Sequence, residues 1–218
     1  MSGVTYDYME QYIRGLISSN NIVLKELEDY AKDNAVPIIQ KEVGKFLELI
    51  INIKKPVKIL ELGTAIGYSA ILMHISGNGG NKITTIERNN DMVNIARENI
   101  NKYGYYDKIE VLEGDCIQIL EKLQDKYDFI FMDAGKGHYN HFLPHCLRLL
   151  KNDGVIVADN VLFKGMVASK DLIIKRKITI VKRMKTYLEM VSSNNELITS
   201  VIPMGDGIAV TTRRYNND

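Results

Sequence analysis

The hydrophobic positions of this chain change their spacing near residue 53. Before that point, apolar residues recur at helical spacing over 23–31 and again over 43–51. Pro37 lies between these segments and disfavours a helical conformation at Val36, so a break is expected there. The first 52 residues are therefore predicted to form helices.

After residue 53, short continuous apolar runs alternate with amphipathic segments. The runs are rich in β-branched and aromatic residues, which is typical of parallel strands buried on both faces. Predicted strands are 57–62, 82–87, 108–112, 127–133 and 155–159, and predicted helices are 69–75, 90–103, 117–123 and 139–150. This alternation predicts an α/β fold with a doubly wound, mostly parallel sheet.

The C-terminal part of the chain has a different pattern. A basic helical stretch runs to about Val191, and two apolar runs follow at 197–202 and 208–212. Asp206-Gly207 lies between these runs and is a hairpin signal. We therefore expect the sheet to end in an antiparallel pair.

Length and composition are consistent with one globular domain. The chain has 218 residues, of which 45% are hydrophobic and 25% charged, and its formal net charge is +1. We predict a single domain over 1–218, with N-terminal helices at 1–52 and the sheet-forming core at 53–218. Such a small net charge excludes a global attraction to nucleic acid or membrane, so any attraction must come from a local patch.

Cysteine usage and the N-terminus bear on the compartment. Cys116 and Cys146 lack metal-type spacing and are expected to be buried and reduced. The N-terminus has neither a basic n-region nor an apolar h-region, and no apolar run approaches the ~20 residues needed to span a bilayer. We therefore expect a cytoplasmic protein without a membrane partner.

Polar residues follow two of the predicted strands at the point where each ends. Asp133 ends the 127–133 run, and Asp159-Asn160 ends the run that begins at 155. Ligands of open parallel sheets bind outside the carboxyl ends of the strands, where these side chains would project. Two carboxylates and an amide oxygen suit Mg²⁺ or Mn²⁺ better than zinc. Lys136, three residues beyond Asp133, is a candidate base beside such a metal.

The first predicted strand leads into a turn with two glycines, Gly63 and Gly67. Such a turn lets the backbone approach a ligand, but the G-x-G-x-x-G of dinucleotide folds is absent. Glu87, at the end of the second strand, could accept ribose hydroxyls, and Asp115, after the third, could meet an adenine amine. Acidic residues that can bind a sugar, in a site without a phosphate-binding motif, suit S-adenosylmethionine. The alternative is that these acids only cap helices.

These motifs together resemble a known family. The quoted segments are Glu61-Leu62-Gly63-Thr64-Ala65-Ile66-Gly67-Tyr68-Ser69, Glu87, Gly114-Asp115, Asp133-Ala134-Gly135-Lys136-Gly137-His138-Tyr139 and Asp159-Asn160-Val161. They resemble the successive motifs of the cation-dependent O-methyltransferases, the group that contains catechol and caffeoyl-CoA O-methyltransferases. Within the group, Val36-Pro37-Ile38, 159–165 and 203–207 are most similar to the bacterial tRNA 5-hydroxyuridine methyltransferases.

The resemblance implies a Rossmann-like class I methyltransferase fold, S-adenosylmethionine and Mg²⁺ as cofactors, and a homodimer. Asp133, Asp159 and Asn160 would hold the metal, and Lys136 would be the catalytic base. The implied cofactor-binding residues are Val36, Glu61, Gly63, Ser69, Glu87, Asp115 and Asp133. The implied reaction methylates 5-hydroxyuridine at the wobble position of the tRNA anticodon loop to 5-methoxyuridine.

A basic stretch is the one hint about the acceptor from the residues themselves. Eight basic residues and a single acid, Asp171, occur between 164 and 185: Lys164, Lys170, Lys175, Arg176, Lys177, Lys182, Arg183 and Lys185. This stretch could contact RNA phosphates or be only a solvated helix face.

Two alternative functions stay open. One is an O-methyltransferase of small catechols or hydroxylated phenylpropanoids, and the other is a non-catalytic S-adenosylmethionine-binding protein. His138 is a further residue that could touch substrate.

Overall fold

The computed structural model of the chain describes residues 4–18 and 21–215. Its helices are α1 (Asp7–Gly15), α2 (Ile22–Asp33), α3 (Lys41–Lys54), α4 (Tyr68–Ser76), α5 (Asn90–Lys102), α6 (Cys116–Lys122), α7 (Tyr139–Leu149) and α8 (Ile178–Ser192), with 3₁₀ turns η1 (Lys170–Leu172) and η2 (Lys175–Lys177). Its strands are β1 (Lys58–Leu62), β2 (Lys82–Glu87), β3 (Ile109–Glu113), β4 (Tyr127–Met132), β5 (Leu150–Ala158), β6 (Leu197–Ile202) and β7 (Ile208–Arg213).

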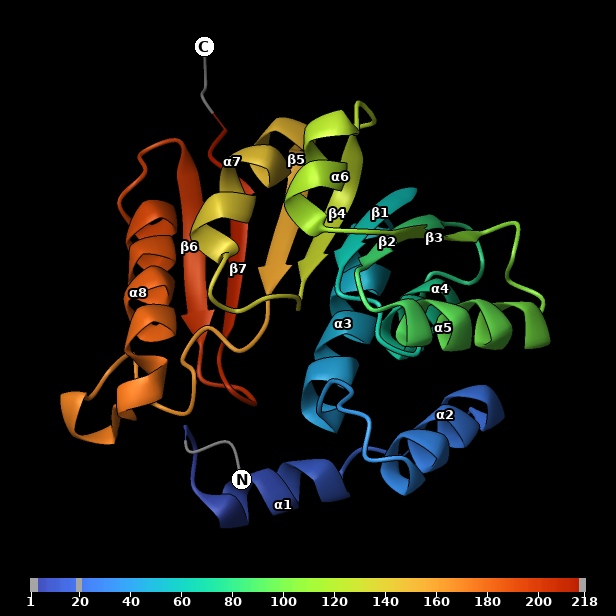
Figure 1. Cartoon of the computed structure of the whole chain (residues 1–218), viewed down its shortest axis with the longest axis horizontal. Coiled ribbons are helices and arrows are strands. Elements are labelled where there is room, and N and C mark those ends of the chain that lie inside the picture. Colours follow the sequence, from blue (N-terminus) through green and yellow to red (C-terminus); the bar gives the residue numbers. More distant parts are fainter. Residues whose placement is uncertain (1–3, 19–20, 216–218) are drawn as a thin grey trace.

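The strands form one seven-stranded sheet in the order β3-β2-β1-β4-β5-β7-β6 (Figure 1). Strands β1 to β5 pair in parallel, whereas β7 runs antiparallel to both β5 and β6. The predicted doubly wound α/β sheet with an antiparallel C-terminal pair is therefore confirmed. The strand order reverses between β1 and β4, which is where sheets of this type bind ligands.

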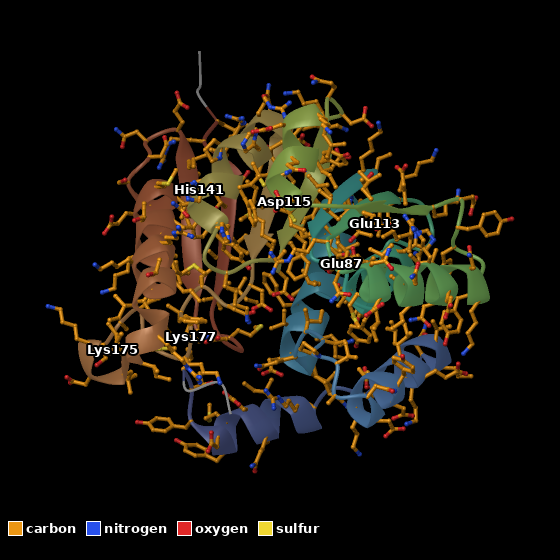
Figure 2. All side chains as sticks on the ribbon, viewed as in Figure 1. Glu87, Glu113, Asp115, His141, Lys175 and Lys177 are labelled. Atoms are coloured by element: carbon orange, nitrogen blue, oxygen red, sulfur yellow. The ribbon has the colours of Figure 1, made fainter. Side chains whose placement is uncertain are left out.

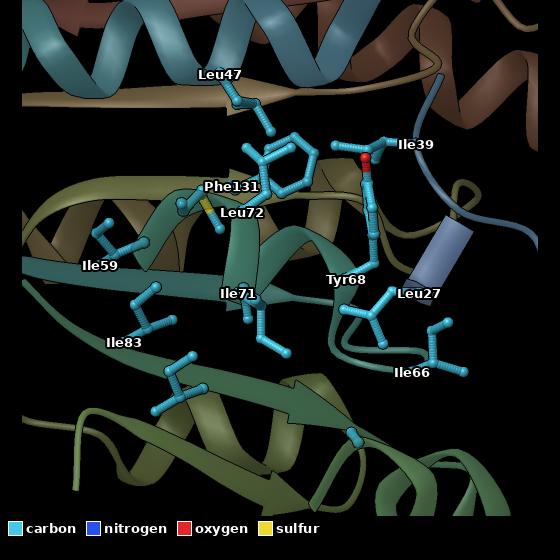
Figure 3. Packing of buried hydrophobic residues seen from close by; sticks show 14 of the residues in the cluster. Leu27, Ile39, Leu47, Ile59, Ile66, Tyr68, Ile71, Leu72, Ile83 and Phe131 are labelled. Atoms are coloured by element: carbon cyan, nitrogen blue, oxygen red, sulfur yellow. The ribbon is translucent and has the colours of Figure 1, made fainter. Parts of the chain in front are cut away.

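Alternating residues of each central strand face opposite layers of helices. Ile59 of β1 packs into the cluster that contains residues of α2, α3, α4 and α5 (Figure 3). Its neighbour Leu60 packs into a second cluster with residues of α6, α7 and α8. Strands buried on both faces in this way have apolar residues at every position, as the uninterrupted runs of the sequence indicate.

Polar side chains fix where several helices begin. The Asn21 side chain accepts a hydrogen bond from the backbone of Leu24 at the start of α2, and Asn89 caps α5 in the same manner. These caps satisfy backbone N–H groups that have no partner within the helix. Helix α4 instead follows Gly67, whose φ of +85° turns the chain out of β1.

Two predicted elements differ from the structure. Strand β5 begins at Leu150, not at 155, because the chain passes from α7 directly into an irregular pairing in which Tyr127 faces Leu150 and Phe129 faces Val155. The basic stretch is helical only from Ile178; before it, the chain forms η1 and η2. The polar residues between the two parts of β5 made its first half indistinguishable from a turn in the sequence.

Both cysteines are free. Cys146 is buried, as expected, whereas Cys116 is only half-buried. In the part of the chain that the structure describes, no helix combines the length and the apolar character required to cross a bilayer.

Candidate functional site

A cavity of about 580 Å³ opens at the carboxyl ends of the strands. A volume of this size is typical of small-molecule and cofactor sites. Most of the residues singled out from the sequence line it: Gly63, Ser69, Glu87, Asp115, Asp133, Lys136, Asp159 and Asn160. The fold thus brings together, in one cavity, residues that are nearly 100 positions apart in the chain.

The glycine turn brings the ends of two strands close together. Gly63 has a φ of +100°, and a Cβ at this position would lie 2.9 Å from the backbone oxygen of Asp133. Any other residue would therefore be strained in its backbone and would collide with the end of β4. This close approach places the turn beside Asp133 and leaves the cavity in front of both.

Backbone N–H groups hold the two acids predicted to bind the nucleoside. Glu87 accepts hydrogen bonds from the backbone of Ala65 at 3.1 Å and of Arg88 and Asn89 at 2.9 Å. The Asp115 side chain caps α6, as the alternative interpretation expects. Both carboxylates nevertheless line the cavity, so their structural bonds fix them where a ligand could also reach them. Both residues are labelled in Figure 2.

Apolar residues lie next to these two acids in the sequence and line the same cavity. Ile86 precedes Glu87, and Cys116 and Ile117 follow Asp115. An apolar wall flanked by acceptors suits a flat, hydrogen-bonding ring such as a purine.

Two of the predicted cofactor residues do not line the cavity. Val36 is half-buried and packs against the core, while its neighbours 37–40 form part of the cavity wall. Glu61 is fully buried and accepts a 2.5 Å hydrogen bond from Thr85, whose hydroxyl lies 2.6 Å from that of Thr64. Thr64 lines the cavity, so Glu61 is connected to it through two hydroxyl groups.

Burial has the largest effect on the pKa of Glu61. Burial raises the pKa of its carboxyl group to about 7, against the lowering effect of the Ser69 and Thr85 hydroxyls. A carboxyl group in an apolar environment favours its neutral form because no water solvates the charge.

Asp133 and Asp159 end the adjacent strands β4 and β5 and face the same cavity. Burial raises the pKa of both carboxyl groups, and the charge of Asp133 raises that of Asp159 further. Lys136 lowers both pKa values but does not restore them to the usual range. Among the described residues, no basic side chain lies within salt-bridge distance of either carboxylate.

This pair fits a divalent cation. Two neighbouring carboxylates without a cationic partner repel each other, and a bound cation offsets that repulsion. Over residues 4–18 and 21–215, no group of three or more His, Cys, Asp or Glu side chains is arranged to hold a metal. A site here would therefore need the amide oxygen of Asn160, a residue that adopts a left-handed φ of +60° directly after Asp159.

Tyr139 connects the two strand ends from below. Its hydroxyl lies 2.9 Å from the carbonyl oxygen of Met132 and 3.0 Å from that of Asp159. Its side chain is only 1% exposed, so it supports the backbone on which the candidate ligands are mounted.

The structure adds cavity residues that sequence analysis did not assign to the site. Gln40, Tyr68, Lys164 and Asp206 all line it. His138, which the sequence suggested as a residue that could touch substrate, lines it as well. In the sequence, Lys164 belongs to the basic stretch and to the segment 159–165, and Asp206 to the hairpin signal and to the segment 203–207, but neither is predicted as a site residue. Their proximity depends on how the C-terminal hairpin folds back onto β5, which no local pattern reports.

Comparison with known proteins identifies the family. A family model described as "O-methyltransferase" matches residues 16–214 of this chain. The chain therefore belongs to the O-methyltransferase family.

Its relatives include enzymes of two named kinds. It is 28% identical to a caffeoyl-CoA O-methyltransferase of Populus kitakamiensis, over 82% of this chain and 78% of the relative. It is 29% identical to a catechol O-methyltransferase of Niastella koreensis, over 78% and 80% of the two chains.

Solved structures agree in fold. A Staphylococcus aureus protein provisionally named as a caffeoyl-CoA O-methyltransferase superposes with a TM-score of 0.88 at 30% identity, covering 95% of this chain and 100% of that one. An O-methyltransferase of Bacillus cereus, solved in complex with SAH, has a TM-score of 0.83 at 25% identity over 95% and 97%.

Proposed function

We propose that this protein transfers the methyl group of S-adenosylmethionine to a hydroxyl oxygen of an acceptor that carries two adjacent oxygen atoms, with Mg²⁺ as the second cofactor. The observation that carries the proposal is the arrangement of one cavity: Lys136 lies with Asp133, Asp159 and Asn160, and the glycine turn, Glu87 and Asp115 line its remainder. Membership of the O-methyltransferase family supports it.

The cofactor would lie against the glycine turn. Glu87 would accept the ribose hydroxyls, and Asp115 would receive the adenine amine beside the apolar wall. The sulfonium charge would be placed near the carboxyl ends of β1 and β4, where Gly63 and Asp133 approach each other closely and both line the cavity.

Asp133, Asp159 and Asn160 would hold Mg²⁺, which when bound lowers the pKa of an acceptor hydroxyl and orients it. Lys136, acting in its neutral amine form, would take the hydroxyl proton at Nζ and become an ammonium, leaving an oxygen nucleophile that attacks the methyl carbon. The carbon–sulfur bond then breaks, and its electron pair stays on sulfur. Proton transfer by a positioned side chain contributes roughly 10²–10⁴-fold to a rate.

For the acceptor we propose 5-hydroxyuridine at the tRNA wobble position, with 5-methoxyuridine as the product. Its 5-hydroxyl and O4 are adjacent oxygens, and an unpaired anticodon base can be splayed into a pocket. The basic stretch supports a nucleic-acid acceptor: η1, η2 and the start of α8 lie at the same end of the molecule as the carboxyl ends of β4 and β5 (Figure 1), and Lys164 lines the cavity.

A small catechol or a hydroxylated phenylpropanoid is the second candidate acceptor. The names of the relatives, caffeoyl-CoA and catechol O-methyltransferases, favour it directly. Such an acceptor would use the same metal ligands and the same Lys136, so only the acceptor distinguishes the two candidates.

Methyl transfer from labelled S-adenosylmethionine, with and without EDTA, tests both. One reaction contains tRNA that carries 5-hydroxyuridine, another the same tRNA with unmodified uridine, and a third contains catechol. We expect Mg²⁺-dependent labelling of the hydroxylated tRNA alone.

Each other result has a defined meaning. Labelling of catechol but not of tRNA would transfer the activity to small molecules and leave the cavity assignment intact. Labelling that persists in EDTA would remove the metal from the proposal. No labelling of any acceptor with adjacent oxygens, despite cofactor binding, would favour a non-catalytic cofactor-binding protein.

A further inference from the structure

A further acidic residue, outside the predicted ligand set, also faces the cavity. Asp206 belongs to the turn between β6 and β7, is 7% exposed, and lines the cavity together with Asp159 and Lys136. Since a carboxylate is rarely buried without partners, its contacts indicate what it does there.

Those contacts are with the loop that follows β5. A side-chain oxygen of Asp206 accepts a hydrogen bond from the backbone N–H of Lys164, and its carbonyl oxygen accepts one from Leu162 at 3.0 Å. The carbonyl oxygen of Gly207 accepts another from Val161 at 2.9 Å. The loop is thus bonded to the turn at three of its backbone N–H groups.

This loop needs such support. Asn160, Phe163 and Lys164 have φ angles of +60°, +45° and +56°, a region that residues with a Cβ disfavour. A loop with such angles keeps one conformation only where its surroundings determine it. Asn160 is one of the three candidate metal ligands, so the conformation of the loop determines where this ligand lies.

The turn that carries Asp206 has little freedom to move. A Cβ on Gly207 would lie 2.3 Å from Cγ of Leu162, and one on Gly205 would lie 3.0 Å from Cγ2 of Val43. The turn is therefore packed directly between the loop and α3. A carboxylate on such a turn has a fixed position relative to both.

The charges around Asp206 agree with this placement. Burial raises the pKa of its carboxyl group, while the Lys164 N–H and the cations of Lys136 and Lys164 oppose that rise. The Asp206 carboxylate therefore interacts electrostatically with the candidate base Lys136 and with the candidate metal ligand Asp159.

We infer that Asp206 is a positioning residue: by bonding the loop after β5, it holds Asp159 and Asn160 in the conformation that binds the cation. This inference rests on the proposed Mg²⁺ site. It assigns to the C-terminal hairpin a role in metal binding that neither the predicted ligand set nor the family membership contains. Partners that orient metal ligands in this way typically change metal affinity by 10–100-fold when removed.

The test measures Mn²⁺ binding by electron paramagnetic resonance, without acceptor, for the wild type and for Asp206→Ala and Asp206→Asn. Calorimetry of SAH binding in EDTA provides the second measurement. We expect Asp206→Ala to bind Mn²⁺ about 10–100-fold more weakly and SAH as tightly as the wild type. Asp206→Asn keeps an oxygen that can accept the Lys164 N–H, and should bind both like the wild type.

Asp153→Ala is the matched control, because this exposed carboxylate lies outside the cavity and contacts Lys54. Unchanged Mn²⁺ affinity in Asp206→Ala would overturn the inference, and so would an equal loss in Asp206→Asn, which would assign the effect to charge. If Asp206→Ala does not fold, Asp206→Leu replaces it with the same expected outcome. A wild type that binds no Mn²⁺ would overturn the metal site itself, which is a distinguishable result.

Discussion

At the scale of single residues, Lys136 has the most direct part in the proposed chemistry. It is half-buried on the loop after β4, lines the cavity, and its cation lowers the pKa values of both Asp133 and Asp159. A residue in this position affects the reacting hydroxyl more than the binding of the nucleoside, whose predicted contacts lie at Glu87 and Asp115.

Lys136→Ala is expected to reduce kcat by roughly 10²–10⁴-fold, the usual contribution of a general base. The affinity for SAH, measured by calorimetry, should stay unchanged because the mutation leaves the nucleoside contacts intact. Lys122→Ala, an exposed lysine on α6, serves as the control. Wild-type turnover in the Lys136 variant would exclude this residue from the mechanism.

The protonation of Glu61 affects the free energy of unfolding. Its pKa of about 7 in the folded chain lies above the ordinary 4.5, so the folded state binds its proton more tightly than the unfolded state does. Its stabilising contribution is complete below pH 4.5 and is lost as the pH rises through 7. A shift of this size corresponds to about 3 kcal/mol in the free energy of unfolding.

Glu61→Gln removes that titration and should flatten the pH dependence. Urea unfolding at pH 4.5 and pH 8, in EDTA and without cofactor, is expected to show the variant gaining about 3 kcal/mol relative to the wild type over this interval. Parallel stability profiles for the two proteins would show that Glu61 keeps an ordinary pKa.

At the scale of elements, helix α1 is attached to the cavity wall by one arginine. Arg14 donates two hydrogen bonds to Glu42, at 2.7 and 2.8 Å, and one to Gln40 at 2.7 Å. Glu42 is buried, and Gln40 lines the cavity. A bidentate arginine–carboxylate pair combines charge with a defined orientation, so it fixes how α1 lies on the start of α3.

Arg14→Ala should release α1 without unfolding the sheet. Because Glu42 then remains buried without its partner, we expect a loss of about 1–3 kcal/mol, less than for a fully buried pair because Arg14 is partly exposed. Hydrogen exchange should show faster exchange in Asp7–Gly15 and unchanged protection in β4 and β5.

The control for that experiment is Lys25→Ala. The pair of Lys25 with Asp29 on α2 is exposed on both sides, so its removal should cost at most about 0.5 kcal/mol. Equal effects of the two substitutions would contradict a specific role for Arg14.

At the scale of the whole molecule, the apolar residues of α1 are not covered by the chain that the structure describes. Met9 and Ile13 are exposed, and Tyr6 and Leu16, the cap residues at the two ends of α1, are 73% and 68% exposed. These exposures show that α1 does not bury its apolar side chains against the sheet, and the homodimer that the sequence resemblance implies stays a prediction.

Light scattering should therefore give twice the chain mass of 24.8 kDa. Leu16→Glu, which places a charge in the exposed face of α1, should shift the protein toward the monomer. Ile53→Glu introduces the same charge at a similarly exposed position on α3 and should not. A monomeric wild type would refute the homodimer.

Much of the fold was predictable because it is encoded locally. The continuous apolar runs predicted β1 to β4 to within one residue at each end, and Asp206-Gly207 predicted the antiparallel pair. Residues at strand ends were predictable for the same reason: parallel strands place their carboxyl ends at one edge, so Asp133 and Asp159 were expected at the same edge of the sheet.

Tertiary structure alone decided the rest, because it depends on contacts between distant segments. It placed Glu61 beneath the cavity and not in its wall, buried Tyr139 under the two strand ends, and brought Asp206 against the loop that carries Asn160. The sequence determined by itself most of the helices and strands and which chemical groups end the strands, since both follow from the periodicity and identity of neighbouring residues. Which of these groups share a cavity, and which only support it, depends on packing that is settled when the sheet, the helices and the C-terminal hairpin come together.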